Sequence, residues 1–179
     1  DTKADANVVI GNANSDFNLG FTNTISFKGL TVYALFDYKK GGDIYNLTNQ
    51  WMYRDYRAKD MDQFGKPEYQ KKTIDYYNVL YNIAGMNSHF VEDGTFVKLR
   101  ELSVYYQPPS SLLKNVLGGF FKSFRIGIIG RNLVTWTYYS GWDPEVGTTE
   151  GDGDNTIQAW DEFDYPNFRT FSGSIEFKF

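Results

Sequence analysis

Cysteine is absent from this chain of 179 residues. Its absence excludes disulfide bonds, thiolate zinc sites and thiol catalysis, although it does not fix the compartment. Histidine occurs once, at His89, so there is neither a histidine cluster for a metal nor a Ser-His-Asp arrangement. No apolar run reaches the roughly 18 residues that a transmembrane helix requires. The sequence therefore predicts no cofactor and no membrane-spanning helix.

A large excess of charge of one sign is also missing. The chain has 18 Lys+Arg and 22 Asp+Glu, a weakly acidic balance that gives no support to a nucleic-acid partner. Loop carboxylates such as Asp143, Glu145 and Asp161 could pair as glycosidase acids, but with this many acids the pairing has no specificity. We therefore predict that the chain is not an enzyme. The acidic run over 150–155 fits neither register of a calcium-binding EF-hand loop, and a solvated turn is favoured.

Aromatic residues, in contrast, are abundant. Phenylalanine, tyrosine and tryptophan number 15, 14 and 4, or 18% of the chain. This excess indicates interfacial girdles, a binding surface or both.

The last eleven residues alternate between apolar and polar side chains. One face carries Phe171, Gly173, Ile175, Phe177 and Phe179, and the residues between them are polar or charged. Because a strand sends successive side chains to opposite faces, this segment has one apolar and one polar side. An alternating strand that ends on an aromatic residue is typical of an outer-membrane barrel, with lipid outside and a polar lumen inside.

Five strands are predicted from patterns of this kind. They cover residues 17–27, 30–38, 96–106, 124–136 and 169–179. Lys28-Gly29 makes a tight turn that joins the first two strands into a hairpin.

Two of these strands carry details that the pattern must explain. In 96–106, Val97 and Leu99 have the opposite parity to Leu102, and a bulge near Arg100-Glu101 would return both halves to one face. In 124–136, Arg125 and Arg131 alternate with the apolar residues, and we expect both to face the lumen. An arginine in contact with lipid at mid-bilayer would cost about 2–4 kcal/mol.

Strand length and loop length favour a membrane over solution. An eleven-residue strand tilted by about 45° rises roughly 26 Å, close to the apolar band of about 25 Å in such barrels. The links at 28–29 and 107–123 are then the inner turns, and 39–95 and 137–168 are long outer loops. We expect helices at Asp43–Arg57 and Pro67–Ile83 in the first outer loop, and a short helix at Ser110–Leu117. Five strands cannot close a barrel, so a larger antiparallel barrel is predicted.

Several sequence blocks resemble one family, in order along the chain. The resemblance extends from about Asn7 to Phe179 and is to the carboxy-terminal region of SusC/RagA-type TonB-dependent outer-membrane transporters of Bacteroidetes. The blocks are Gly11-Asn-Ala-Asn-Ser-Asp-Phe-Asn-Leu-Gly-Phe21, Ala34-Leu-Phe-Asp-Tyr-Lys-Lys-Gly-Gly-Asp-Ile-Tyr-Asn46, Phe90-Val-Glu-Asp-Gly-Thr-Phe-Val-Lys-Leu-Arg-Glu-Leu102, Gly130-Arg-Asn-Leu-Val-Thr-Trp-Thr137, Gly141-Trp-Asp-Pro-Glu145 and Tyr165-Pro-Asn-Phe-Arg-Thr-Phe171.

The resemblance implies an all-β fold, in which the chain supplies the carboxy-terminal strands of a transmembrane barrel of about 22 strands. It implies an outer-membrane importer of oligosaccharides or peptides, capped by a SusD-like surface lipoprotein and energised by TonB. From the resemblance, we expect the plug domain and the segment that contacts TonB to lie outside the residues of this chain. In this family, Ile175, Phe177 and Phe179 would be read by the outer-membrane insertion machinery; alternatively, Phe179 only anchors the strand at the inner interface.

Aromatic residues of the outer loops are candidates for contact with a sugar ring or with the lid lipoprotein. They are Trp51, Tyr53, Tyr56, Tyr138, Tyr139, Trp142 and Trp160, of which Trp142, Tyr139, Trp160 and Trp51 are our selected candidates. Packing within the loops is the alternative role for each. For the whole chain, the alternatives are a soluble or secreted β-sandwich that binds carbohydrate through exposed aromatics, and a non-transporting barrel such as an adhesin.

Overall fold

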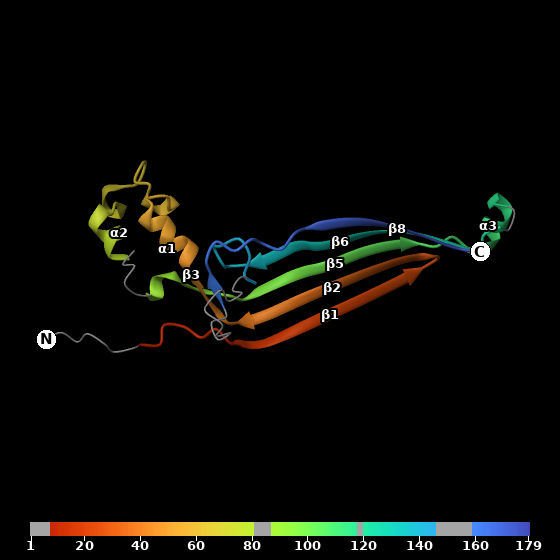
Figure 1. Cartoon of the computed structure of the whole chain (residues 1–179), viewed down its shortest axis with the longest axis horizontal. Coiled ribbons are helices and arrows are strands. Elements are labelled where there is room, and N and C mark those ends of the chain that lie inside the picture. The colour runs from red at the N-terminus through yellow and green to blue at the C-terminus, as the bar shows by residue number, and fades with distance from the viewer. Residues whose placement is uncertain (1–7, 81–86, 118–119, 146–158) are drawn as a thin grey trace. The chain divides into compact units, whose positions relative to one another are not determined.

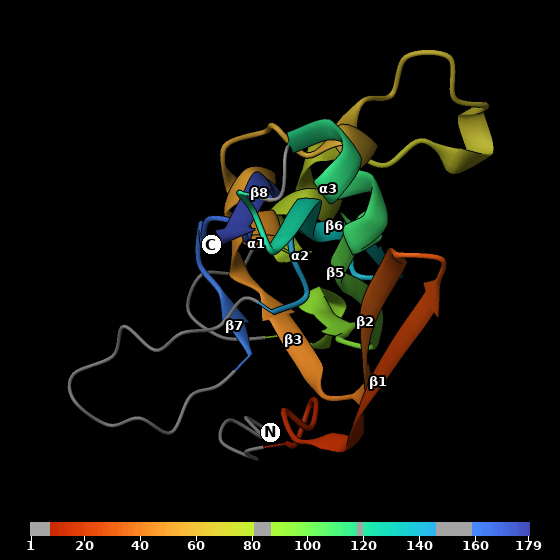
Figure 2. The same cartoon turned by 90° about the vertical axis from the view of Figure 1, so that its right-hand side faces the viewer.

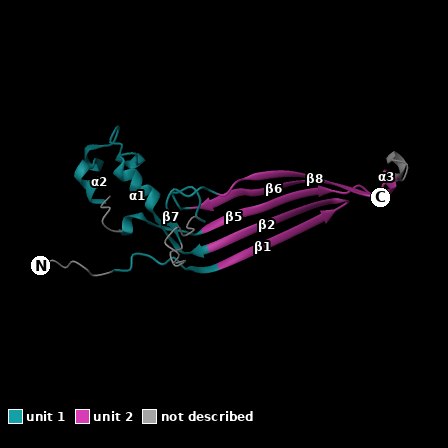
Figure 3. Ribbon diagram, viewed as in Figure 1, with its two compact units in different colours: residues 1–17, 40–95, 138–166 teal, residues 18–39, 96–137, 167–179 magenta. Residues whose placement is uncertain are grey.

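The computed structural model describes residues 8–80, 87–117, 120–145 and 159–179. The chain divides into two compact units (Figure 3). The sheet unit consists of residues 18–39, 96–137 and 167–179, and the loop unit of residues 1–17, 40–95 and 138–166. Among the described residues, no helix combines the length and apolar character needed to cross a membrane.

The sheet unit is built on five long strands. They are β1 (Ser15–Phe27), β2 (Leu30–Gly41), β5 (Phe96–Tyr106), β6 (Ser123–Thr137) and β8 (Thr170–Lys178). The strands lie side by side in the order β1-β2-β5-β6-β8, and Figure 2 shows the same order from a second direction. The pairs β2–β5, β5–β6 and β6–β8 are antiparallel. Because strands of soluble proteins usually have about five or six residues, the 13 residues of β1 and 15 of β6 are unusually long.

The turn between β1 and β2 explains why this hairpin forms. Lys28 and Gly29 have φ angles of 48° and 85°, as the two central residues of a type I′ turn require. A Cβ atom at Gly29 would lie 2.2 Å from the carbonyl oxygen of Gln107, so only glycine fits there. Ser26 and Thr31 pair their hydroxyls across the hairpin at 3.0 Å.

Strands β5 and β6 both contain irregularities next to each other in the sheet, near Arg100 and Asn132. Leu35 of β2 pairs with Glu101 of β5, and the next residue of β2 pairs with Leu99, which leaves Arg100 as the extra residue of a bulge. This confirms the bulge predicted near Arg100-Glu101. Strand β6 adds a further residue, because Glu101 pairs with Arg131 while Leu99 pairs with Val134. Within this β6 insertion, Asn132 has a φ of 51°.

The link between β5 and β6 contains the helix α3 (Ser110–Leu117), with the bounds that we predicted. Pro108 and Pro109 precede it, where proline ends the ladder of β5 and sets φ for the start of a helix. The backbone N–H of Leu112 donates to the carbonyl of Pro109 at 3.0 Å.

The loop unit combines a small sheet with short helices. Its sheet has the order β4-β3-β7, from β3 (Asp43–Asn46), β4 (Val91–Asp93) and β7 (Trp160–Asp161). Its helices are α1 (Leu47–Arg54) and α2 (Ile74–Leu80), with the 3-10 turns η1 (Lys59–Met61), η2 (Glu68–Gln70) and η3 (Ser88–Phe90). The aromatic rings of Tyr45, Tyr53, Tyr77 and Phe90 form its core together with Ala58.

Both helices predicted in the first outer loop were too long. Residues 43–46 form β3 because they pair with β4 and β7, and α1 begins only after Asn46, whose side chain accepts the N–H of Asn49 at 2.8 Å. Pro67 precedes the 3-10 turn η2, and α2 begins at Ile74. Residues 81–83 of the second predicted helix lie outside the described residues.

Candidate functional site

One face of the five-stranded sheet is apolar and exposed. The register brings the apolar residues of adjacent strands into rows across the sheet, which are Leu30–Tyr106–Ile126–Ile175, Val32–Val104–Ile128–Gly173, Ala34–Leu102–Gly130–Phe171, Phe36–Leu99–Val134 and Tyr38–Val97–Trp136. Many of these side chains are exposed, with Ile128 at 67% and Phe171 at 71%. A contiguous apolar surface of this extent is not typical of a soluble monomer.

The exposure of β8 distinguishes two of the architectures considered from the sequence. In a β-sandwich, Phe171, Ile175 and Phe177 would be buried beneath a second sheet. Their side chains are instead 71%, 62% and 47% exposed. The exposed face therefore argues against the sandwich and is what a lipid-facing sheet requires.

The opposite face is polar and contains both predicted lumen arginines. Arg125 lies with its guanidinium carbon 4.0 Å from the ring centre of Tyr105, and that ring covers Gly127, where a Cβ would meet it at 2.3 Å. The Nε of Arg131 donates to Glu101 at 3.0 Å on the neighbouring strand. Alternation thus places both arginines away from the apolar face.

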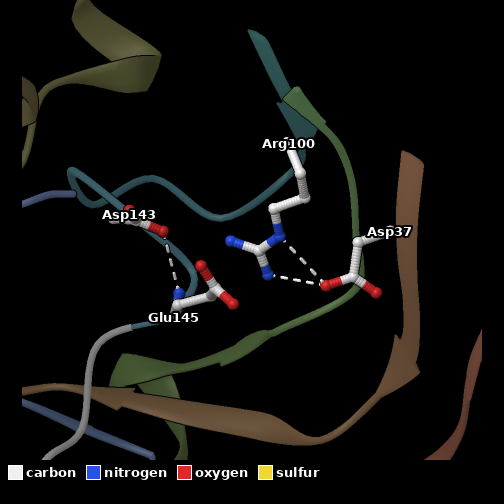
Figure 4. A network of polar contacts seen from close by, with 4 residues as sticks. All are labelled: Asp37, Arg100, Asp143 and Glu145. Atoms are coloured by element: carbon white, nitrogen blue, oxygen red, sulfur yellow. Dashed lines mark hydrogen bonds and ion pairs between the residues drawn. The ribbon is translucent and has the colours of Figure 1, made fainter. Parts of the chain in front are cut away.

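The bulged residue Arg100 has a carboxylate partner in the sheet unit. Its Nε and one terminal nitrogen donate to the same oxygen of Asp37, at 3.1 and 2.6 Å (Figure 4). Because both side chains are half-buried, this ion pair is better shielded from water than an exposed pair. It stabilises the β2–β5 pairing at the bulge, where the ladder is interrupted.

Phenylalanine rings cluster around the carboxy-terminal residue. Phe179 lies 5.5 and 5.1 Å, between ring centres, from Phe120 and Phe121, and Phe121 also contacts Phe177 at 5.2 Å. The N–H of Lys122 donates to the carbonyl of Lys178 at 2.7 Å. Two of the three residues predicted as an insertion signal, Phe177 and Phe179, are therefore in contact with the segment that precedes β6, whereas Ile175 pairs with Ile126 within the sheet.

Polar contacts within the loop unit join residues distant in sequence, and the one between Tyr139 and Asp161 is buried. Asp161 accepts hydrogen bonds from the hydroxyls of Tyr139 and Thr48, the latter at 2.8 Å. Glu92 accepts from the hydroxyl of Ser140 at 2.7 Å and from the side-chain amide of Asn46 at 2.8 Å. Burial raises the pKa of Tyr139, and its hydrogen bond to Asp161 raises it further, so its hydroxyl stays protonated as a donor.

Removal of this buried acceptor tests what holds the loop unit together. Asp161→Ala removes the carboxylate that accepts from the hydroxyls of Tyr139 and Thr48, although the backbone carbonyl of residue 161 still lies 3.3 Å from the Thr48 hydroxyl, and we expect a loss of about 1–3 kcal/mol in local stability. Hydrogen exchange of 40–80 and 138–145 in the complete protein measures it. Glu162→Ala is the control, because Glu162 accepts only from the indole of the neighbouring Trp160 within the described contacts. Equal exchange in both variants would contradict a structural role for Asp161.

The four selected aromatic candidates lie in different environments. Trp142 is 78% exposed, whereas the ring of Tyr139 is only 5% exposed and so offers almost no surface for stacking. Trp160 stacks on Tyr45 with ring centres 4.9 Å apart. Trp51 lies 4.4 Å from the guanidinium carbon of Arg54. Of the four, Trp142 presents its indole most freely.

Carboxylates of the link between β6 and β8 do not form a metal site in the described residues. Asp143 accepts the backbone N–H of Glu145 at 3.0 Å (Figure 4). No group of three or more potential metal ligands occurs in the part of the chain that the structure describes. The acidic run at 150–155 lies outside the described residues.

Sequence reasoning missed one group of residues, although it named one member, Tyr56, among the aromatic candidates. Arg57, Lys59 and Lys72 line a pocket of the loop unit with Tyr56 and Tyr77. The sequence holds no motif for it, because the cations are spread over a segment without a repeating pattern. Only the folding of 56–77 upon itself brings them together.

Comparisons with known proteins agree with the architecture. No family model matches the chain. Over 96% of its length, the chain is 29% identical to TonB-dependent receptor P3 of Formosa agariphila, and it is 28% identical to TonB-dependent receptor P39 of the same organism over 92%. The RagAB peptide importer in its open-open state matches with a TM-score of 0.65 at 24% identity over 93% of the chain.

The chain corresponds to a limited part of these proteins. It spans 17% and 16% of the two receptors and 17% of the matched chain of the importer. Long antiparallel strands with an exposed apolar face are typical of transmembrane β-barrels. The matches agree with the predicted resemblance: in sequence the chain is similar to a segment of TonB-dependent receptors, and in fold it is similar to part of the RagAB importer.

Proposed function

We propose that this chain forms part of the wall and outer loops of an outer-membrane TonB-dependent importer. The observation that carries the proposal is the apolar face of the sheet unit, whose rows continue across the strands and remain exposed. Such a face is stable in contact with lipid, because apolar side chains avoid there the unfavourable free energy of exposure to water. The polar face with Arg125 and Arg131 then lines the lumen.

The whole importer would be a closed barrel of about 22 strands with a plug, of which this chain supplies five strands. Its sequence similarity to TonB-dependent receptors supports energisation by TonB through another part of the protein. We further propose a SusD-like lipoprotein as the lid and an oligosaccharide or a peptide as the substrate. The fold similarity to a protein described as a peptide importer supports a peptide as one candidate substrate.

We propose that the carboxy-terminus and the turn at 28–29 lie on the periplasmic side of the membrane. Residues 39–95 and 137–168 then form outer loops, since alternate links of an antiparallel sheet lie at the same end. Trp142 is the loop aromatic that we propose for contact with substrate or lid, because its indole is exposed.

Labelling of adjacent residues on β8 tests the membrane wall. Phe171→Cys and Ser172→Cys replace exposed neighbours that point to opposite faces. With spin labels in the complete receptor in lipid vesicles, we expect residue 171 to collide mainly with membrane-dissolved oxygen and residue 172 mainly with a water-soluble nickel chelate. Equal access of the nickel chelate to both labels would contradict the proposal.

A further inference from the structure

A pocket of about 580 Å³ lies within the loop unit, between the segment that follows α1 and the start of α2. This volume falls in the range of about 300–1,000 Å³ that is common for small-molecule sites. We propose that the pocket binds a carboxylate group of an oligomeric ligand. The inference rests on the proposed import function and narrows its substrate class to acidic oligomers.

The pocket wall carries a local excess of positive charge. Arg57, Lys59 and Lys72 line it, and Asp62 is its one acidic residue. The carboxylate of Asp62 accepts the N–H of Phe64 at 2.9 Å. Among the described contacts, none of the three cations forms an ion pair, although the chain as a whole is acidic with a formal charge of −4. Three cations without carboxylate partners favour an anion, and the planar guanidinium of Arg57 suits a carboxylate.

Hydrogen bonds fix the wall of the pocket before any ligand binds. The side-chain amide of Gln63 donates to the carbonyl of Met61 at 2.7 Å and to the hydroxyl of Tyr77 at 3.0 Å. Its oxygen accepts the backbone N–H of Lys72 at 2.9 Å. Gln63 therefore joins the two segments that carry the cations, and such preorganisation reduces the entropy lost on binding.

Tyr56 occupies a backbone position that normally favours glycine. It follows the carboxy-terminal cap of α1, where its N–H donates to Tyr53 at 3.2 Å and the N–H of Arg57 donates to Met52 at 2.8 Å. These two bonds define a Schellman motif, whose left-handed residue is usually glycine. Tyr56 has a φ of 54°, which is strained for a large side chain.

Packing does not account for a tyrosine at this position. Tyr56 is 59% exposed, and within the described part of the chain its hydroxyl makes only a long contact of 3.4 Å with Asn78. Its ring lines the pocket beside the cations. A ring in this place can stack on the apolar face of a sugar or on a peptide side chain while the cations hold a nearby carboxylate. An acidic peptide and a uronate-containing oligosaccharide share this chemistry.

The test is a titration of the complete, detergent-solubilised receptor by calorimetry. The probes are a glutamate-containing pentapeptide and its glutamine counterpart, and an oligogalacturonate and its neutral methyl ester. We expect one carboxylate probe to bind at least about tenfold more tightly than its neutral partner, with an affinity that falls as salt rises. Preference for the peptide or for the oligogalacturonate identifies the source of the carboxylate. Equal binding of charged and neutral probes, or no binding of any, would overturn the proposal.

Three variants assign the binding to this pocket. The double variant Arg57→Gln/Lys72→Gln should weaken binding of the carboxylate probe about tenfold or more. Lys71→Gln is the control, because Lys71 pairs with Glu68 at 2.8 Å and does not line the pocket. Tyr56→Gly should weaken binding while the loop unit keeps or gains thermal stability, since glycine relieves the strain at φ 54°. Unchanged affinity in both pocket variants would contradict the site.

A parallel measurement separates this inference from the proposed function. Depletion of unlabelled oligomers from the medium by energised cells reports import whether or not the ligand is acidic. If the cells deplete the oligomers but the receptor shows no preference for carboxylate probes, the pocket proposal alone is overturned. If the cells deplete no oligomer and the receptor is also absent from the outer membrane, the importer proposal is overturned.

Discussion

Ile128→Arg is expected to destabilise the complete barrel by about 2–4 kcal/mol in lipid vesicles, because an arginine would then face hydrocarbon. Ile128 is suited to this test since it lies within β6 and is 67% exposed on the apolar face. Its cross-strand neighbours on that face are Val104 and Gly173, which offer no carboxylate to pair with the new charge. The measurement is equilibrium unfolding by denaturant of the receptor reconstituted in vesicles.

The adjacent residue supplies a matched control. Ile129 has the same side chain on the same strand but points to the polar face, where its neighbours are Ser103 and Ser172. We expect Ile129→Arg to cost much less, since a lumen-facing arginine stays hydrated. Equal losses in the two variants would show that the substitution acts through strand packing, and the assignment of the apolar face to lipid would be wrong.

Residue alternation accounts for how much of the sheet could be predicted. A pleated strand with lipid on one side and water on the other must alternate, so the sequence locates such strands and their faces. The bulge at Arg100 was predictable because one extra residue reverses the parity between Leu99 and Leu102. The irregularity in β6 was not, although it lies at the same level of the sheet.

The difference between these two irregularities is arithmetic. Between the same two rows of the sheet, β2 advances from Ala34 to Phe36, and β5 from Leu102 back to Leu99. Strand β6 advances from Gly130 to Val134, and therefore has two residues more than β2. Two extra residues leave the parity unchanged, so the pattern contains no signal. The insertion is seen only in the structure, as the register shift between β5 and β6 and the left-handed φ of 51° at Asn132.

The loop unit was harder to predict because its structure depends on contacts between distant segments. Residues 43–46 read as the start of a helix, but they pair with β4 and with β7, which lie far along the chain. The same long-range folding buries Tyr139 against Asp161 and leaves Trp142 exposed. Aromatic residue type alone could not distinguish the buried ring from the exposed one.

Phe179→Ala is expected to remove most of the receptor from the outer membrane if the terminal aromatic is read during insertion. The structure suggests a second role, because the ring of Phe179 contacts Phe120 and Phe121. A variant at Phe179 alone would disturb both roles at once. Two measurements distinguish the roles. The amount of heat-modifiable protein in the outer-membrane fraction reports insertion, and the stability of the inserted protein reports the ring contacts.

Phe121→Ala provides the separation, since it removes ring contacts to Phe177 and Phe179 and leaves the terminal strand unchanged in sequence. We expect this variant to insert at a near-normal level but to unfold at lower denaturant concentration, because an aromatic pair contributes about 0.5–1.5 kcal/mol beyond the area it buries. Phe179→Tyr keeps an aromatic end and should insert normally. If Phe121→Ala instead lowers the membrane yield as strongly as Phe179→Ala, the ring cluster rather than the terminal signal governs assembly, and Phe179 acts as an interfacial anchor.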